Sequence, residues 1–432
     1  MEPILVGIIG IIILIALLFS GMSIGVGMAV VGFLGFGVLI GFDPALGMLK
    51  TVPYTTFAEH SLSVIPLFML MGAFAFSSGL SEDLFDAVYK WLGHFRGGVA
   101  MATIVACGLF AAISGSSLAT AATLGAVALP EMRKYKYDDG LATGAIAAGG
   151  SVGILIPPSV ILIIYGIITE QSIGKLFLAG FVPGVLEVVF YLFTIWYLTY
   201  FNPDHGPRGP KTTFREKVWA LKKTWEVVLL FIVVIGGIYR GVFTPTEAAG
   251  VGAFGSFFFA LIKGRLGWGN FKESLLSTMK TTGMIFMIIL GAMIFGYFLS
   301  VTRLPTELAH FVSTLPVNRY LILAIILIIT LALGCIMDSM AIVLLTIPVF
   351  FPLILRLDFD PIWFGILVVR VTEMGLITPP VGLNVFIIRG ISGVPIGKIF
   401  RGVFPHLVAD ALEVVALVIF PQISLFLPSL ME

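Results

Sequence analysis

The stretches "GILIPPS" at residues 153–159 and "GLITPPV" at residues 375–381 decide how this chain folds. Each places two consecutive prolines inside a long apolar run, and the two stretches are 222 positions apart. Proline has no backbone N–H and its ring clashes with the preceding helical turn, so neither run continues as one unbroken helix. The sequence therefore predicts two interrupted helices at matching positions in the two halves of the chain.

The composition indicates a membrane protein. Hydrophobic residues make up 59% of the 432 residues, charged residues make up 11%, and the mean hydropathy is +1.09. A soluble domain has roughly 25% charged residues, so contact with a lipid bilayer has to replace the missing polar surface. We therefore expect an all-α polytopic membrane protein. The net charge of +1 gives no reason to expect a nucleic acid partner, and the two cysteines support neither a disulfide framework nor a transition-metal site.

The prolines also reveal an internal repeat. All four prolines between residues 130 and 183 have a counterpart at the same offset of 222, and the pairs are Pro130 with Pro352, Pro157 with Pro379, Pro158 with Pro380 and Pro183 with Pro405. We predict two repeats, at residues 1–210 and 223–432, joined by a cytoplasmic linker at residues 211–222.

Each repeat is expected to contain a hairpin and a broken helix. A membrane span needs about 20 apolar residues, and shorter runs are more often re-entrant. The apolar arms around "SGSS" (114–117) and "CIMDSM" (335–340) are mostly shorter, which favours re-entrant hairpins at about 98–130 and 321–352. The broken helices are expected at about 141–168 and 361–390.

The basic residues favour an inverted arrangement of the two repeats. Each repeat is expected to cross the membrane five times, and an odd number of crossings inverts the second repeat relative to the first. With the N-terminus outside, predicted inner loops hold seventeen of the 25 Lys and Arg residues and outer loops hold six. This bias follows the positive-inside rule. Only Lys280, at an expected helix start, and Arg370, inside an apolar run, remain.

Interrupted helices supply ion ligands in membranes. Non-helical backbone at membrane depth persists only where it is buried or lines a cavity, and its free carbonyl oxygens bind cations. Polar side chains at the hairpin tips and breaks add hard oxygen ligands, and glycines let backbones approach closely. We therefore predict a sodium-binding set made of Ser114, Ser117, Gly149, Gly153, Pro157, Gly334, Asp338, Ser339, Gly375 and Thr378. For the tip serines and Asp338 the alternative is N-capping of the following helix, which is compatible with ion binding.

Arg370 is the strongest single candidate for binding a substrate. A cation near the bilayer midplane costs about 2.5 kcal/mol or more and normally faces a cavity or a partner. Arg370 is therefore predicted to clamp a substrate carboxylate, together with Ser116, Ser117 and Glu373. The alternative is an internal ion pair between Arg370 and Glu373, one helical turn away. Glu373 is alternatively a proton-sharing or gating group.

Two long stretches resemble a known family. The run from "ISGSSLATAATLGAVALPEM" (113–132) to "FVPG" (181–184), and "PIWFGILVVRVTEMGLITPPVGLNVFIIRG" (361–390), are similar to the large membrane subunit of tripartite ATP-independent periplasmic (TRAP) transporters. The resemblance covers essentially the whole chain. It implies an elevator-type, sodium-coupled importer of organic acid anions in the bacterial inner membrane, assembled with a small four-helix membrane subunit and a periplasmic substrate-binding protein. We expect the small subunit to be a separate chain, because the first repeat begins at residue 1.

The resemblance leaves the substrate open among C4-dicarboxylates, keto acids and acidic sugars, and an acidic sugar such as sialic acid is our first expectation. An ATP-driven permease would need a phosphate loop, and "IGKL" (173–176) and "IGKI" (396–399) lack its glycine spacing. We expect no enzyme, because Ser116 has no intramembrane histidine partner in the pattern and Asp338 has no aspartate twin. A passive anion channel remains the alternative.

Overall fold

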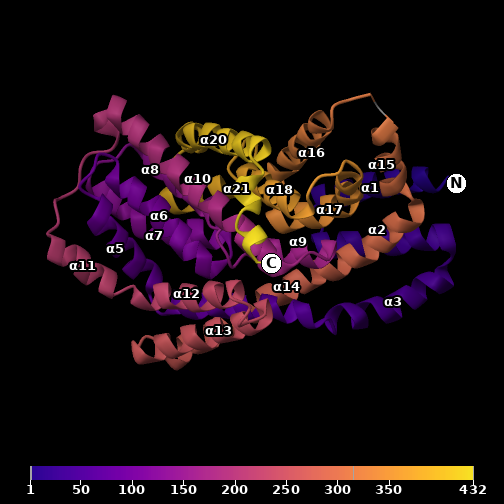
Figure 1. Cartoon of the computed structure of the whole chain (residues 1–432), viewed down its shortest axis with the longest axis horizontal. Helices are drawn as coiled ribbons and strands as arrows, with labels where there is room; N and C mark the ends of the chain where they lie inside the picture. The colour runs from indigo at the N-terminus through magenta and orange to yellow at the C-terminus, as the bar shows by residue number, and fades with distance from the viewer. Residues whose placement is uncertain (1, 315, 432) are drawn as a thin grey trace.

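The computed structural model describes residues 2–314 and 316–431. Within these ranges every regular element is a helix, so the predicted all-α fold class is confirmed (Figure 1). The first half contains ten α-helices: α1 (Pro3–Phe19), α2 (Ile24–Ile40), α3 (Phe42–Phe57), α4 (Val64–Ser77), α5 (Leu80–Leu92), α6 (Gly98–Ser114), α7 (Ser117–Lys134), α8 (Asp139–Val152), α9 (Val160–Thr169) and α10 (Ile173–Phe201). A short 3₁₀ helix, η1 (His60–Ser63), connects α3 to α4.

The second half begins after a linker that contains η2 (Pro203–His205) and α11 (Phe214–Lys222). Its helices are α12 (Trp225–Tyr239), α13 (Pro245–Ile262), α14 (Trp268–Thr302), α15 (Leu304–Thr314), α16 (Arg319–Gly334), α17 (Ser339–Arg356), α18 (Pro361–Gly375), α19 (Leu383–Ser392), α20 (Ile396–Ile419), α21 (Gln422–Leu425) and η3 (Pro428–Leu430).

Many helix bounds recur at the offset of 222. The helices α7 and α17 both contain 18 residues, and they begin at Ser117 and Ser339. One difference is that α3, η1 and α4 correspond to the single 35-residue helix α14. Lys280 therefore lies inside α14, and the expectation that it stands at a helix start is wrong. The inversion of the second set of helices across the bilayer stays a prediction.

The two sets of helices pack on each other in reciprocal pairs. α2 packs along α14 while α4 packs along α13, and α7 packs on α19 while α9 packs on α17. The contact between α2 and α14 depends on glycine, since a Cβ atom at Gly32 would lie only 2.8 Å from the Phe295 Cα atom. Close backbone contact at small residues is typical of helix pairs in membranes. The two halves are thereby interlocked over most of their length.

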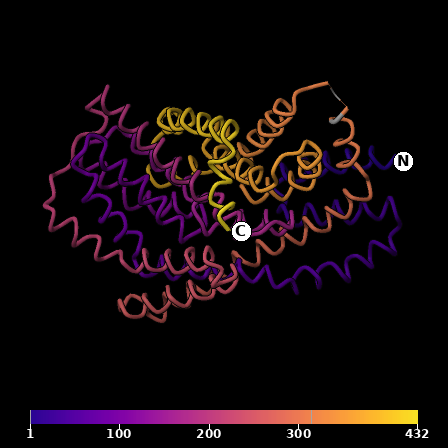
Figure 2. The backbone as a smooth tube through the Cα atoms, in the orientation of Figure 1, coloured from indigo at the N-terminus to yellow at the C-terminus, as the bar shows by residue number. Residues whose placement is uncertain are grey.

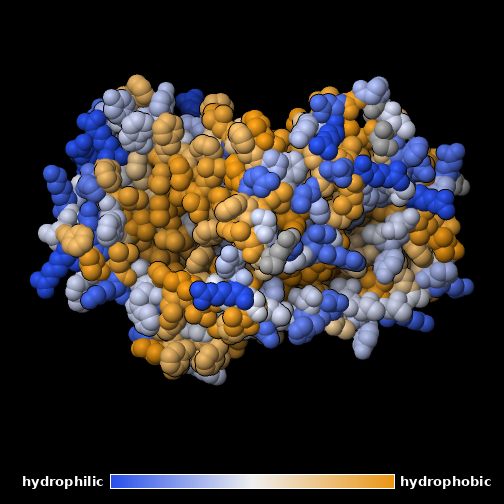
Figure 3. All heavy atoms as spheres, in the orientation of Figure 1, coloured by the Kyte–Doolittle hydropathy of each residue, from blue (hydrophilic) through white to orange (hydrophobic). Residues whose placement is uncertain are grey.

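The described helices suit a lipid environment. The segments that are long and apolar enough to cross a membrane are His60–Ser77, Ile173–Phe201, Pro245–Ile262, Trp268–Thr302, Ser339–Arg356 and Ile396–Ile419. Figure 3 shows a broad hydrophobic area on one face and hydrophilic residues at both ends of the molecule, including the end that holds the linker. The N-terminal end and α11 lie at opposite ends of the long axis (Figures 1 and 2). This placement is compatible with the predicted outer N-terminus and cytoplasmic linker.

Candidate substrate and ion site

Each hairpin tip lies against the helix break of its own half. The first break separates α8 from α9 at residues 153–159, and the second separates α18 from α19 at residues 376–382. At the first tip Gly115 has a φ of +62°, and a Cβ atom there would lie 3.6 Å from the Pro158 carbonyl oxygen. At the second tip a Cβ atom on Gly334 would lie 3.0 Å from the Gly375 Cα atom. Both double-proline stretches therefore form non-helical backbone next to a hairpin tip.

The polar residues of the two tips cap the helices that follow them. The Ser116 hydroxyl accepts a hydrogen bond from the Ala119 N–H at 3.3 Å. The Asp338 carboxylate accepts hydrogen bonds from the N–H groups of Met340 and Ala341 at 3.0 and 3.2 Å. The capping alternative is therefore correct for Ser116 and Asp338. Asp338 also lines a cavity of about 260 Å³ between α1 and the second tip, so capping leaves this carboxylate in contact with open space.

The two tips converge on Glu373. The Ser339 hydroxyl donates a hydrogen bond to Glu373 Oε1 at 2.7 Å, and Ser117 of the first tip lies beside the same carboxylate. All three side chains are buried. The contact joins α7 of the first half and α17 of the second half to the last turn of α18. Three sequence-predicted residues that are far apart in the chain thus form one polar centre.

Several buried oxygen atoms on α18 and α19 have no hydrogen-bond partner. Among the described residues they include Glu373 Oε2, Thr372 Oγ1 and Asn384 Oδ1, all on fully buried side chains. An unpaired buried polar atom is costly, so a bound ion or water is the usual explanation. Carboxylate, hydroxyl and amide oxygens are ligands of a hard cation. Asn384 was not predicted as an ion ligand from the sequence, because an asparagine at the start of an apolar run is usually interpreted as a helix cap.

Other predicted sodium ligands mainly support packing. Gly149 allows α8 to approach α6, because a Cβ atom there would lie 2.9 Å from Cys107 Sγ. Gly153 stands directly against Ala111 in the same way, next to the break that contains Pro157. The Ser114 hydroxyl is paired with the Thr120 hydroxyl at 2.9 Å. Thr378 lies in the second break, and its hydroxyl donates a hydrogen bond to the Met374 carbonyl at 2.7 Å. The Thr378 side chain is therefore bonded to the backbone of the preceding turn.

A polar cavity of about 580 Å³ opens beside the first tip. It lies between α4 and α14 on one side and α6 and α7 on the other, and the start of α7 forms part of its wall. The polar residues that line it are Ser77, Glu82, Ser114, Ser116, Thr123, Asn270, Glu273, Ser274, Ser277, Thr278 and Thr281. Its volume accommodates a small organic molecule. The partial positive charge at the α7 N-terminus favours an anionic group near Ser116.

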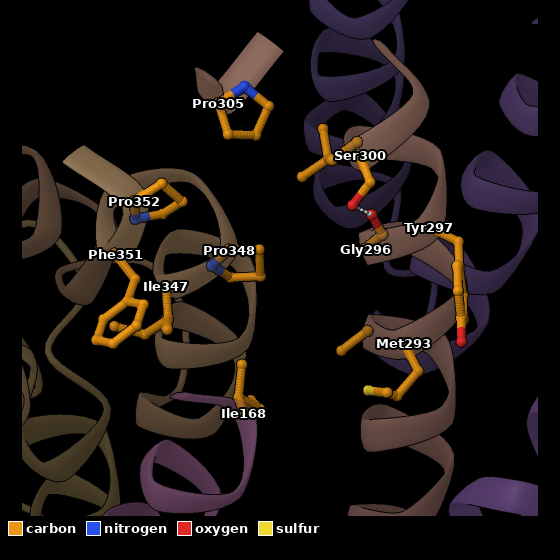
Figure 4. Close-up of a pocket in the computed structure, with 12 residues that line it drawn as sticks. Ile168, Met293, Gly296, Tyr297, Ser300, Pro305, Ile347, Pro348, Phe351 and Pro352 are labelled. Atoms are coloured by element: carbon orange, nitrogen blue, oxygen red, sulfur yellow. Dashed lines mark hydrogen bonds between the residues drawn. The ribbon is translucent and has the colours of Figure 1, made fainter. Parts of the chain in front are cut away.

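A second pocket, of about 350 Å³, differs in chemistry (Figure 4). Ile347, Pro348 and Phe351 of α17 form one wall, and Met293 and Gly296 of α14 form part of the opposite wall. The lining is apolar except for hydroxyl groups such as that of Ser300, which is already bonded to the Gly296 carbonyl at 2.9 Å. This pocket therefore offers little to an organic anion.

Arg370 does not line either pocket, and its side chain is fully buried. Arg370 Nε donates to Glu413 Oε2 at 2.7 Å, Nη2 donates to Asp410, and Nη1 lies 3.2 Å from Glu187 Oε1. The structure therefore contradicts the predicted clamp on a substrate carboxylate. Arg370 does form an internal ion pair, as the alternative predicted. Its partners, however, are Glu187, Asp410 and Glu413, and not Glu373.

These three acidic partners were not predicted from the sequence. Glu187 interrupts the apolar run of α10, and Asp410 and Glu413 interrupt that of α20. The tetrapeptide "LEVV" occurs at both 186–189 and 412–415, which was an available signal. An acidic residue inside an apolar span is as costly as a basic one, so it points to a charged partner on another helix.

Paired hairpins and broken helices that meet around buried polar atoms in an all-α membrane protein define a membrane transporter. A comparison with solved structures finds the same fold in another protein. MtrF from Neisseria gonorrhoeae superimposes with a TM-score of 0.65 at 14% identity, over 88% of this chain and 85% of that chain. The chain belongs to the DctM component family of tripartite ATP-independent periplasmic transporters, whose family model matches residues 11–423.

Two relatives show how far this similarity extends. The chain is 38% identical over 400 residues to the C4-dicarboxylate TRAP transporter large permease protein DctM of Pseudomonas aeruginosa, which covers 92% of this chain and 93% of that protein. It is 33% identical over 421 residues to the sialic acid TRAP transporter large permease protein SiaM of Vibrio cholerae, covering 96% and 97%. The protein is therefore a multi-pass permease of the bacterial inner membrane.

Proposed function

We propose that this permease imports an organic acid anion by sodium-coupled secondary transport, with the polar cavity at the first hairpin tip as its substrate site. The observation that carries the proposal is the cavity of about 580 Å³, which joins hydroxyl groups and the Asn270 amide to the N-terminus of α7 and also has the carboxyl groups of Glu82 and Glu273 in its wall. Arg370 has no direct part in it. Ser116 is the predicted residue best placed to contact the anion, because it caps α7 and lines the cavity.

Two substrate classes are candidates. An acidic sugar such as sialic acid is favoured by the lining, because many hydroxyl side chains match a polyhydroxylated ligand and none of the lining residues is Lys or Arg. A C4-dicarboxylate is favoured by the relative from Pseudomonas aeruginosa. Keto acids, the third group that the resemblance left open, are also organic acid anions. The two candidates differ in the number of carboxylates that the protein has to neutralise.

The proposed coupling ion is Na⁺, held where the two tips meet the two breaks. Ser117 and Ser339 contact the carboxylate of Glu373, and the unpaired oxygen atoms of Glu373, of its neighbour Thr372 and of Asn384 on α19 suit a hard cation. The backbone at Gly149, Gly153, Pro157, Gly334 and Gly375, and the side chains of Ser114, Asp338 and Thr378, stay in the proposal as neighbouring ligands.

The proposed cycle is of the elevator type. The cavity is bordered by Glu82 and Asn270, which stand near the predicted inner loops, so this conformation would release substrate to the cytoplasm. The hairpins and broken helices would move together past α4 and α14 to reach the outer side. A small four-helix membrane subunit and a periplasmic substrate-binding protein are the proposed partners, in line with the tripartite family description.

The test is uptake into proteoliposomes that contain the permease, its small subunit and its binding protein. Sialic acid and succinate are offered in parallel, with and without an inward sodium gradient. We expect one of them to accumulate only when the gradient is present. Equal flux with and without the gradient would instead identify a passive anion channel, and accumulation without sodium would remove Na⁺ as the coupling ion.

A further inference from the structure

The ion cluster around Arg370 has an imbalance of charge. Arg370 of α18 contacts Glu187 of α10 and Asp410 and Glu413 of α20, and all four side chains are completely buried. Three ionised carboxylates and one guanidinium would leave two uncompensated negative charges in the interior. A buried charge without a counter-charge is strongly unfavourable, and such groups are neutralised by a proton or a cation.

Histidine cannot balance the cluster by itself. His406 of α20 is also buried, and its ring packs against that of Tyr191 with ring centres 5.1 Å apart. If His406 were charged, two positive groups would still face three carboxylates, so one negative charge would remain. At least one further positive charge is therefore required whichever form His406 takes, and a proton on a carboxyl group supplies it without a separate ion. Glu373, one turn from Arg370 on α18, adds a further acidic group on the same side.

Glu187 is the carboxyl group best suited to hold this proton. Asp410 and Glu413 each accept a hydrogen bond from Arg370, which stabilises their ionised forms. Both oxygen atoms of Glu187 lack a hydrogen bond, and its nearest charged neighbour is Arg370 Nη1 at 3.2 Å. The buried hydroxyl of Tyr191, one turn along α10, lies next to Asp410. Polar groups from two residues of α10 thus face the cluster, and those of Glu187 are left without a hydrogen bond.

We propose that the cluster is a proton-binding site in which Glu187 carries the proton at neutral pH. The site lies where α10 of the first half packs against α18 and α20 of the second half, outside the lining of the polar cavity and one helical turn from Glu373 on α18. Loss of the proton leaves the excess charge between these helices and separates them. Proton binding thereby controls the packing of α10 against the broken helix α18. This inference does not depend on the identity of the transported anion.

The test compares infrared spectra of the purified full-length chain in lipid nanodiscs. A protonated carboxyl group and a carboxylate absorb at different frequencies, so the difference between the wild-type spectrum and that of Glu187→Gln reports the state of Glu187. We expect this difference at neutral pH to contain a carboxylic acid band. Glu413→Gln and Asp410→Asn are matched variants in the same cluster, and their differences should contain carboxylate bands. Glu59→Gln, at an exposed position, serves as the control for solvent-accessible acids.

The proposal also predicts the pH dependence of uptake. In wild-type proteoliposomes, uptake falls on the alkaline side by about tenfold per pH unit beyond the midpoint, because the protonated fraction falls at that rate. Glu187→Gln, a neutral group of the same shape, removes this fall, whereas Glu59→Gln keeps it. A carboxylate band in the Glu187→Gln difference, an unchanged alkaline fall, or misfolding of Glu187→Gln together with folding of Glu187→Asp would each overturn the proposal.

Discussion

Replacing Arg370 by glutamine should destabilise the protein by removing the cation that contacts three buried carboxylates. The variant loses two charge-assisted hydrogen bonds, to Asp410 and Glu413. Hydrogen bonds to charged groups contribute about 1.5–3 kcal/mol each, and breaking one side of a buried ion pair typically costs about 3–5 kcal/mol in total. We expect a total loss of about 3–5 kcal/mol, because the carboxylates are partly neutralised by protons when their partner is removed.

That loss is large compared with the total free energy of unfolding of most proteins. Native proteins are stable by about 5–15 kcal/mol, so the variant should unfold at a clearly lower temperature or fail to accumulate. The assay is thermal unfolding of the purified chain in lipid nanodiscs, followed by the loss of helical circular dichroism. Arg389→Gln, which changes an exposed arginine on α19, is the matched control and should shift the transition little.

A double-mutant cycle makes the result specific. Arg370→Gln combined with Glu413→Gln should be more stable than Arg370→Gln alone, because the second change removes an uncompensated charge. The reasoning is refuted if Arg370→Gln unfolds at the wild-type temperature and instead loses affinity for the transported anion. That result would restore Arg370 as a substrate-binding residue.

Three further variants test the proposed ion and substrate region. Asp338→Ala should abolish sodium-driven uptake and cost about 1 kcal/mol as α17 loses its N-cap, and normal sodium dependence would remove Asp338 from the ion site. Ser339→Ala removes the 2.7 Å hydrogen bond to Glu373 and should weaken sodium dependence at a stability cost of about 1–3 kcal/mol; an unchanged half-saturating sodium concentration would contradict this. At the predicted inner loops, burial raises the pKa of Asp138, but hydrogen bonds from Lys398 and the backbone outweigh this effect and leave the pKa of Asp138 lowered. Such a group stabilises the fold above its unfolded pKa and loses that effect as pH falls, so the stability gap between wild type and Lys398→Ala should shrink on acidification, and a gap independent of pH would contradict the assignment.

The local features of the fold could be predicted from the sequence because they depend on residues that are neighbours in the chain. Two double prolines stop a helix wherever they stand, and α8 and α18 do end before them. The apolar arms on either side of "SGSS" form α6 and α7 as a hairpin. By contrast, α3 (Phe42–Phe57) was not predicted, because its residues include Asp43, Lys50 and Pro53 and form no long apolar run.

The pairing of distant side chains could not be predicted in the same way. Nothing near Arg370 in the sequence indicates that α10 and α20 bring three acids to it, whereas Glu373 one turn away was a visible local candidate. The meeting of Ser117 and Ser339 at Glu373 likewise depends on how the two halves pack. Spacing identifies which residues share a helix face, but only the packing of helices determines which faces meet.

The position of Glu373 has a consequence for the order of binding events. Since serines from both hairpins reach one carboxylate, occupancy at either tip alters the field and the hydrogen bonds experienced at the other. Thermodynamic linkage makes such influence reciprocal, so each ligand changes the affinity of the other by the same factor. Two cations that bind on either side of this centre would therefore not bind independently, because each would change the affinity for the other through the shared carboxylate of Glu373.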